Sequence, residues 1–174
     1  MTYKLGKRSK KRLEGVHPDL VVVLKLAVSR SKIDFTVLEG LRSLKRQKEL
    51  KASGASKTLN SRHLTGHAVD IAPLLGGKVS WDWPLYYQLE PVVKKAAKDL
   101  GVEIEWGGDW KSFKDGPHWQ LPWSVYGKGD MAPRQLPRGD IRPPSKGHTP
   151  TRPPTKKKTE SWLSNLFASF RRKS

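Results

Sequence analysis

Two histidines and one aspartate in this chain have a spacing that is typical of a catalytic metal site. His63 and Asp70 lie seven residues apart with Gly66 between them, and His118 follows much later in the segment Asp115-Gly-Pro-His-Trp. Catalytic zinc takes three protein ligands and keeps a fourth position for water or substrate. The chain has no cysteine, so a metal must bind through nitrogen and oxygen atoms. We therefore predict a zinc site formed by His63, Asp70 and His118.

The residues before Asp70 indicate how the chain folds back on itself. In an extended strand, side chains alternate between two faces, so Asp70 points away from His67 and from the apolar Val69. We therefore exclude His67 as a ligand. Gly66 is expected to let the chain turn, which brings His63 towards Asp70.

The main alternative for these histidines is a helical pair. Metalloproteases with a His-Glu-x-x-His helix place two histidines on one helix face and use the glutamate as general base. Here Leu64 occupies the glutamate position, and Gly66 opposes a helix between His63 and His67. We reject this arrangement for the present chain.

Two further side chains are candidates for catalysis. A water activated by zinc needs a group that takes up its proton and transfers it to the leaving amine. Asp115, three residues before His118, is the candidate for this general base and acid. Arg42 follows a predicted strand, where it can stabilise a developing oxyanion or bind a substrate carboxylate.

The remaining pattern predicts the elements that must hold these side chains. Apolar periodicity and turn residues predict helices at 18–31, 43–51 and 85–100 and strands at 34–40, 69–74, 102–106 and 117–121. The first helix is rich in valine, so a strand is its alternative. Residues 1–15 are basic and are expected to be loosely held.

Positive charge is concentrated towards the C-terminus. The formal net charge is +18, and residues 127–174 carry 12 Lys and Arg against 3 Asp and Glu. Residues 127–159 hold seven of the 13 prolines, which predicts a disordered basic linker after a catalytic domain at 1–126. At 160–174, apolar residues at helical spacing precede Arg171-Arg172-Lys173, which predicts a cationic amphipathic helix.

This charge predicts attraction to polyanions without selecting one of them. For residues 160–174 we hypothesise contact with an anionic membrane or with lipopolysaccharide. A nucleic-acid-binding protein is an alternative, but the chain has no recognisable motif of that kind, so no specific nucleic acid partner is expected. The basic N-terminus lacks the apolar core of a secretory signal, and no stretch approaches the ~18 apolar residues of a membrane span.

A family resemblance rests on two patterns, Ser61-x-His63-x-x-Gly66-x-Ala68-x-Asp70 and Asp115-x-x-His118. Both resemble the VanY-like zinc peptidases of the lysostaphin/D-Ala-D-Ala-metallopeptidase/Hedgehog fold group. Within that group, the chain looks most like the phage L-alanyl-D-glutamate endopeptidases. The stretches at 13–20, 35–42 and 106–110 are also similar to the group, and the resemblance covers residues 3–123.

The resemblance implies both a fold and an activity. The fold would be α+β, with a small antiparallel sheet and helices packed on it. The activity would be zinc-dependent hydrolysis of the stem peptide of bacterial peptidoglycan, at the L-Ala–D-Glu bond, for lysis of a phage host. The site that it implies consists of the zinc ligands His63, Asp70 and His118, the catalytic carboxylate Asp115, and Arg42 and Ser61 near the substrate.

Rival functions remain open at this point. A D-Ala-D-Ala carboxypeptidase of the same fold would trim the end of the stem peptide instead. A non-enzymatic zinc- or polyanion-binding module is a second rival, although the intact Asp115-x-x-His118 pattern argues against it. For the endopeptidase we expect a monomer that accumulates in the host cytoplasm, because no signal peptide is found, and that then acts in the periplasm or cell wall.

Overall fold

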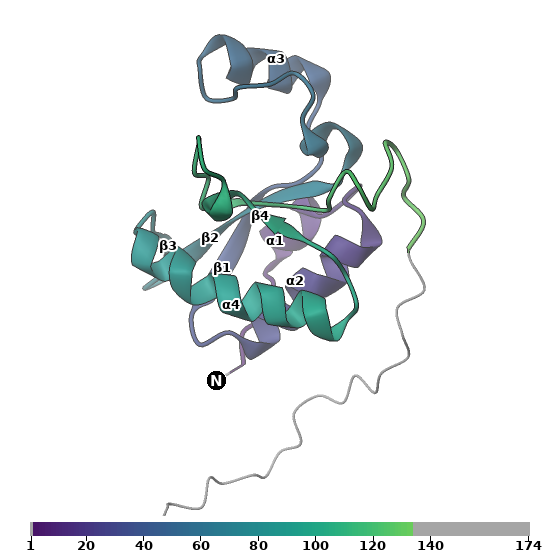
Figure 1. Ribbon diagram of the computed structural model, residues 1–174. Coiled ribbons are helices and arrows are strands. Elements are labelled where there is room, and N and C mark those ends of the chain that lie inside the picture. The colour runs from purple at the N-terminus through teal and green to yellow at the C-terminus, as the bar shows by residue number, and fades with distance from the viewer. Residues whose placement is uncertain (1, 134–174) are drawn as a thin grey trace, which may run out of the picture. The chain divides into compact units, whose positions relative to one another are not determined.

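The computed structural model describes residues 2–133 of the 174-residue chain. Most of the expected linker and the whole of the expected helix at 160–174 therefore lie outside the described residues. Between residues 2 and 133, helices pack beside a small antiparallel sheet (Figure 1), so the predicted α+β fold is confirmed. No helix in this range is long and apolar enough to cross a membrane.

The sheet brings distant parts of the chain into register. Its strands are, in spatial order, β1 (Asp34–Glu39), β2 (Ala68–Leu75), β5 (His118–Gln120) and β4 (Glu105–Trp106), with β3 (Lys78–Val79) paired to the end of β2. All of these pairs are antiparallel. Asp70 lies opposite His118, and Gln120 lies opposite Glu105. Because opposite residues of antiparallel strands share a face, the register decides which side chains meet.

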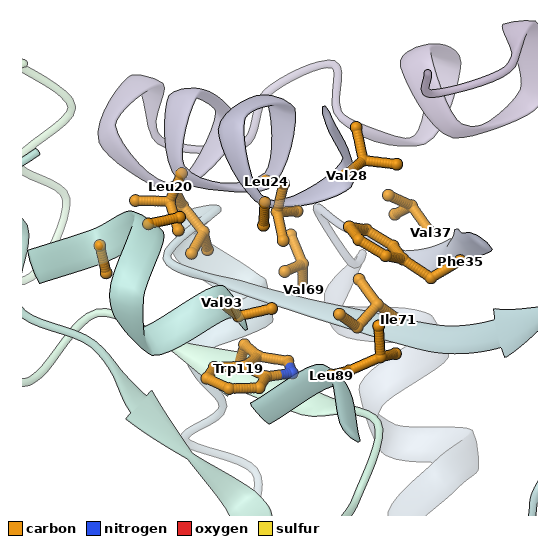
Figure 2. Packing of buried hydrophobic residues seen from close by; sticks show 14 of the residues in the cluster. Leu20, Leu24, Val28, Phe35, Val37, Val69, Ile71, Leu89, Val93 and Trp119 are labelled. Atoms are coloured by element: carbon orange, nitrogen blue, oxygen red, sulfur yellow. The ribbon is translucent and has the colours of Figure 1, made fainter. Parts of the chain in front are cut away.

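Two helices, α2 (Pro18–Arg30) and α4 (Trp83–Asp99), pack against each other beside the sheet. Figure 2 shows their apolar side chains meeting those of the strands in one core, with Leu24, Val69 and Val93 close together. All three side chains are completely buried. Burying a side chain of this kind contributes about 1.5–3 kcal/mol, so the core firmly anchors β2, the strand that carries Asp70.

The helix starts follow the sequence signals. α2 begins at Pro18, and the His17 side chain before it accepts a hydrogen bond from Asp19 N at 3.2 Å. The strand alternative for this segment is therefore wrong. α3 (Leu44–Ala52) has the predicted cap, because Ser43 Oγ accepts a hydrogen bond from Arg46 N at 3.2 Å. In Figure 1, α3 stands apart from the sheet and from the other helices.

The first 15 residues differ from the prediction. They contain a short helix, α1 (Lys7–Arg12), that packs along the edge strand β1. Ser9 is buried, and its hydroxyl contacts Thr36 Oγ1 at 3.0 Å and accepts a hydrogen bond from Val37 N at 3.1 Å. Arg12 donates to Val37 O at 2.7 Å. The prediction that this segment is loosely held is thus wrong. No signal in the sequence indicates the helix, because six residues made almost entirely of lysine and arginine show no apolar periodicity.

A tight turn leads into the central strand. The 3₁₀ helix η1 (Arg62–Thr65) ends at Gly66, whose φ of 70° lies in the left-handed region. A Cβ atom at this position would lie 2.1 Å from Gly15 O, so neither the backbone angle nor the available space suits another residue. The predicted turn at Gly66 is confirmed, and it directs η1 back towards β2.

Candidate active site

The three predicted ligands meet at one point. Their facing atoms are His63 Nε2, Asp70 Oδ1 and His118 Nδ1, and the distances between these atoms are 3.2, 3.2 and 3.3 Å. Tetrahedral zinc with bonds of about 2.0–2.1 Å holds its ligand atoms about 3.3–3.4 Å apart. The donor set and its spacing therefore fit a zinc ion, and these three residues form a group that could hold a metal.

Three different elements deliver these atoms. His63 lies in η1, Asp70 in β2 and His118 in β5. The sheet register places Asp70 directly opposite His118. The turn at Gly66 brings η1 over the same face, and the hydrogen bond from Arg42 N to His63 O at 3.0 Å fixes η1 to the segment that follows β1.

The hydrogen bonds behind the two imidazoles fix where their protons lie. His63 Nδ1 is 2.8 Å from Gly40 O, and a carbonyl only accepts, so Nδ1 donates and Nε2 keeps its lone pair. His118 Nε2 is 3.0 Å from the side-chain oxygen of Gln120, so His118 Nδ1 likewise keeps its lone pair. With Asp70 Oδ1, three electron-rich atoms face one another, which is the arrangement that a cation requires.

The charges in the cluster are strongly coupled. Burial would raise the pKa of Asp70, but the facing His63 and His118 hold that pKa far below its ordinary value. His118 shows the opposite pair of effects. Burial lowers its pKa, but the hydrogen bond to Asp70 outweighs burial and raises the pKa above its ordinary value. Asp70 is therefore a carboxylate at neutral pH, as an oxygen ligand must be.

Asp115 lies in the same cleft as the cluster. Its loop is fixed by two backbone hydrogen bonds, from Asp115 N to Gly107 O at 3.0 Å and from His118 N to Asp115 O at 3.2 Å. Burial and then the charge of Asp70 raise the pKa of the Asp115 carboxyl group, against the opposite effect of nearby cations. A carboxylate with a raised pKa accepts and releases protons more readily near neutral pH.

Arg42 is placed beside the cluster, where its guanidinium contacts other side chains. It donates to Glu39 Oε2 at 2.5 Å, to Asp70 Oδ2 at 3.3 Å and to Gln47 Oε1 at 2.8 Å. Because Arg42 binds Oδ2, the other oxygen of Asp70 is left to face the histidines. This orienting contact with Asp70 was not foreseen from the sequence, which suggested only contacts with the substrate.

A cleft of about 320 Å³ opens over the cluster. Ser61 lines this cleft, and its hydroxyl also accepts a hydrogen bond from His63 N at 3.3 Å, so it caps η1. The Trp110 ring lies 5.1 Å from the His118 ring, centre to centre. Further lining residues from the loops on the two sides of the cleft are Lys57, Thr58, Asn60, Phe113 and Trp123.

Sequence reasoning missed a buried arginine next to the cluster. Arg62 is 2% exposed, and its guanidinium donates to four backbone carbonyls between residues 121 and 127. Its guanidinium also lies 4.2 Å from the ring centre of Trp123. The sequence signal was weak, because an arginine beside a candidate ligand is far more often exposed than buried.

His67, which the strand pattern led us to exclude as a ligand, lies outside the cluster. Its ring nitrogens are each 2.7 Å from a backbone carbonyl, Nδ1 from Thr65 O and Nε2 from Asp130 O. Asp130 belongs to the start of the expected linker, so these first linker residues contact the domain.

Comparison with known proteins identifies the family. The family model described as phage L-alanyl-D-glutamate peptidase matches residues 1–120. The chain is 34% identical over 119 residues to the L-alanyl-D-glutamate peptidase of Escherichia phage T5. This match covers 66% of this chain and 87% of the phage protein. It is 38% identical over 117 residues to the peptidoglycan L-alanyl-D-glutamate endopeptidase CwlK of Bacillus subtilis, covering 56% and 66% of the two chains.

A solved structure gives the same result. The chain is 51% identical to the L-Ala D-Glu endopeptidase ChiX of Serratia marcescens, with a TM-score of 0.67, and the match covers 70% of this chain and 92% of ChiX. The chain therefore belongs to the phage L-alanyl-D-glutamate peptidase family. The resemblance inferred from the sequence patterns is confirmed.

Proposed function

We propose that this chain is a zinc-dependent endopeptidase that hydrolyses the stem peptide of bacterial peptidoglycan at the L-Ala–D-Glu bond and thereby lyses a host cell. The observation that carries the proposal is the meeting of three lone pairs, on His63, Asp70 and His118, in a cleft that also contains Asp115. The relatives' names support the choice of bond, because T5, CwlK and ChiX proteins are all L-Ala–D-Glu peptidases by name.

His63, Asp70 and His118 would hold the zinc ion. When bound, zinc supplies a Lewis acid that polarises the scissile carbonyl and lowers the pKa of a water to about 7. Asp115 then takes the proton of the attacking water and delivers it to the amine of the departing D-Glu residue. The raised pKa of Asp115 suits it to both halves of this transfer.

Arg42 and Ser61 complete the proposed site. Arg42 holds Asp70 through Oδ2 and adds positive charge to the cleft wall, where negative charge develops on the carbonyl oxygen. Ser61 lies at the cleft and can contact the substrate backbone, in addition to capping η1.

The test uses purified peptidoglycan and the full chain. We expect clearing of the suspension, fragments with a new N-terminal D-Glu by mass analysis, loss of clearing after chelation, and recovery on adding zinc. Release of D-Ala alone would instead indicate the D-Ala-D-Ala carboxypeptidase. Zinc binding without any product would indicate a non-enzymatic module. Because peptidoglycan lies outside the cytoplasmic membrane, the proposed enzyme acts in the periplasm or cell wall.

A further inference from the structure

A row of polar side chains crosses three strands of the sheet on the face of the cluster. The register pairs Asp70 of β2 with His118 of β5, and Gln120 of β5 with Glu105 of β4. His118 and Gln120 are two residues apart in one strand, so their side chains share a face. The row therefore runs from the cluster to Glu105, which no part of the mechanism above uses.

Two hydrogen bonds connect this row. His118 Nε2 lies 3.0 Å from Gln120 Oε1, and Gln120 Nε2 donates to Glu105 Oε2 at 2.6 Å. An ionised carboxylate can only accept hydrogen bonds. Glu105 therefore forces the NH₂ group of Gln120 towards itself and the amide oxygen towards His118. That oxygen in turn requires His118 Nε2 to donate, which leaves the lone pair on Nδ1.

The two histidines of the cluster differ in how firmly their protons are fixed. His63 donates to the backbone carbonyl of Gly40, which cannot exchange a donor for an acceptor. His118 depends on a side-chain amide, which can rotate by half a turn and present its NH₂ group instead. A rotated Gln120 would favour the wrong tautomer, with the proton of His118 on Nδ1. Among the side-chain hydrogen bonds of residues 2–133, only the one to Glu105 opposes this rotation.

The geometry points to Glu105 and Gln120 as positioning residues that lock the tautomer and ring orientation of His118 so that Nδ1 faces the metal. The inference rests on the zinc part of the proposed function and extends it to β4. The hydrogen bond between His118 and Gln120 is shielded from water, because His118 is 7% exposed and Gln120 is 8% exposed. Outer partners of metal-bound histidines typically change metal affinity by about 10–100-fold when they are replaced.

The test measures the zinc dissociation constant by competition with a chelator, without peptide substrate. In Glu105→Gln, either orientation of the Gln120 amide finds a partner, so the lock is released and zinc binding should weaken by about 10-fold or more. The double variant Glu105→Gln with Gln120→Glu reverses the relay. Its new carboxylate at 120 can only accept hydrogen bonds, so it accepts one from His118 Nε2–H and one from the amide NH₂ group at 105, and wild-type affinity should return.

A matched control comes from the same segment. Glu103 is exposed and lies two residues before Glu105, and Glu103→Gln removes the same charge without touching the relay, so its zinc affinity should equal that of the wild type. A second readout is the His118 Nε2–H proton in the zinc-loaded protein. This proton should be seen by ¹⁵N NMR in the wild type and in the double variant, and should exchange rapidly with water in Glu105→Gln.

The outcomes separate the inference from the proposed function. Glu105→Gln that binds zinc within threefold of the wild type would overturn the inference. So would a weakened Glu105→Gln that the second substitution does not rescue, because an acceptor-only group beside His118 Nε2 would then not restore the affinity. A wild-type chain that binds no zinc overturns the inference and the metal site together. A chain that shows the full relay behaviour but cuts no peptidoglycan refutes only the proposed function.

Discussion

Asp115 stands apart from the three clustered side chains because no bond in the described structure ties its carboxylate to them. Its backbone is held at both N–H and carbonyl, whereas its side chain lines the cleft. A carboxylate on a fixed backbone, with a raised pKa, is suited to moving protons. In the proposed mechanism, His63, Asp70 and His118 bind the metal through their lone pairs, and Asp115 accepts the proton.

Replacing this carboxylate should therefore separate catalysis from metal binding. We expect Asp115→Asn to lower the rate of peptidoglycan hydrolysis by about 10²–10⁴-fold, because the amide cannot take up a proton, while the zinc dissociation constant stays close to that of the wild type. Asp109→Asn is the control, since Asp109 is an exposed carboxylate in the preceding turn that bonds to Lys94 at 2.7 Å. An Asp115→Asn protein with normal turnover would exclude Asp115 as the general base.

The three facing lone pairs make a prediction about stability. Folding brings these three donor atoms together, so zinc should bind the folded chain far better than the unfolded chain. At free zinc 1,000-fold above the dissociation constant, the stabilisation is about 4 kcal/mol. Chelated protein should therefore melt several degrees lower than zinc-loaded protein in a thermal scan. His118→Ala should abolish this difference, and a His118→Ala variant that zinc still stabilises fully would place the metal elsewhere.

Among the elements, η1 depends on a segment that follows the last strand. The four carbonyls bound by Arg62 belong to Leu121, Pro122, Tyr126 and Gly127. These contacts hold the start of η1 against the segment at 121–127. The support is local, and it fixes the backbone next to His63, the proposed metal ligand.

Arg62→Lys should show how much this support contributes. A lysine has three donors on a single nitrogen and cannot reach four carbonyls arranged around a planar guanidinium. Leaving buried acceptors unsatisfied should lower the free energy of unfolding by about 2–4 kcal/mol in urea titrations. Arg46→Lys on α3, where the side chain is 55% exposed, should change it by less than about 0.5 kcal/mol. Equal effects of the two substitutions would show that the buried contacts add no stability.

The turn at Gly66 gives a second prediction at this scale. Gly66 and Gly54 have similar φ angles of 70° and 77°, but a Cβ would meet Gly15 O at 2.1 Å only at Gly66, whereas at Gly54 it meets nothing within 4 Å. Gly54→Ala should therefore cost about 1 kcal/mol from the backbone angle alone. Gly66→Ala should cost about 2–4 kcal/mol, because the clash adds to it. Denaturant titrations of the two variants would contradict this account if their losses were the same.

The elements that the sequence predicted well are those with a local signal. α2, α3 and α4 have caps or apolar periodicity within a few residues, and β2 alternates around Asp70. α1 and the relay through Glu105 were missed for a different reason. Their partners lie on other elements, and the pairing of Gln120 with Glu105 depends on a strand register that no short window of sequence contains. The cluster of His63, Asp70 and His118 was accessible because each member occurs in a recognisable short pattern.

For the molecule as a whole, the positive charge per residue is much higher in the C-terminal part of the sequence than in the rest. Residues 1–126 and 127–174 each contribute +9 to the net charge, although the second part is much shorter. The described residues reach 133, so the domain boundary at 126, the linker and the helix at 160–174 stay predictions. We expect the positive charge at 160–174 to give the chain a second, electrostatic contact with anionic envelope surfaces that the cleft does not provide.

Removing residues 160–174 tests this division of roles. The cleft residues remain, so hydrolysis of purified peptidoglycan should be unchanged. Lysis of permeabilised cells with intact anionic envelopes should fall several-fold, because an amphipathic cationic segment raises the local concentration of enzyme at such surfaces. The effect should shrink as salt is raised towards 1 M, where charges are screened within about 3 Å. As a matched control, Arg171→Gln with Arg172→Gln and Lys173→Gln removes the charge but keeps the apolar residues. If both variants lyse envelopes as fast as the full chain at low salt, residues 160–174 have no part in targeting.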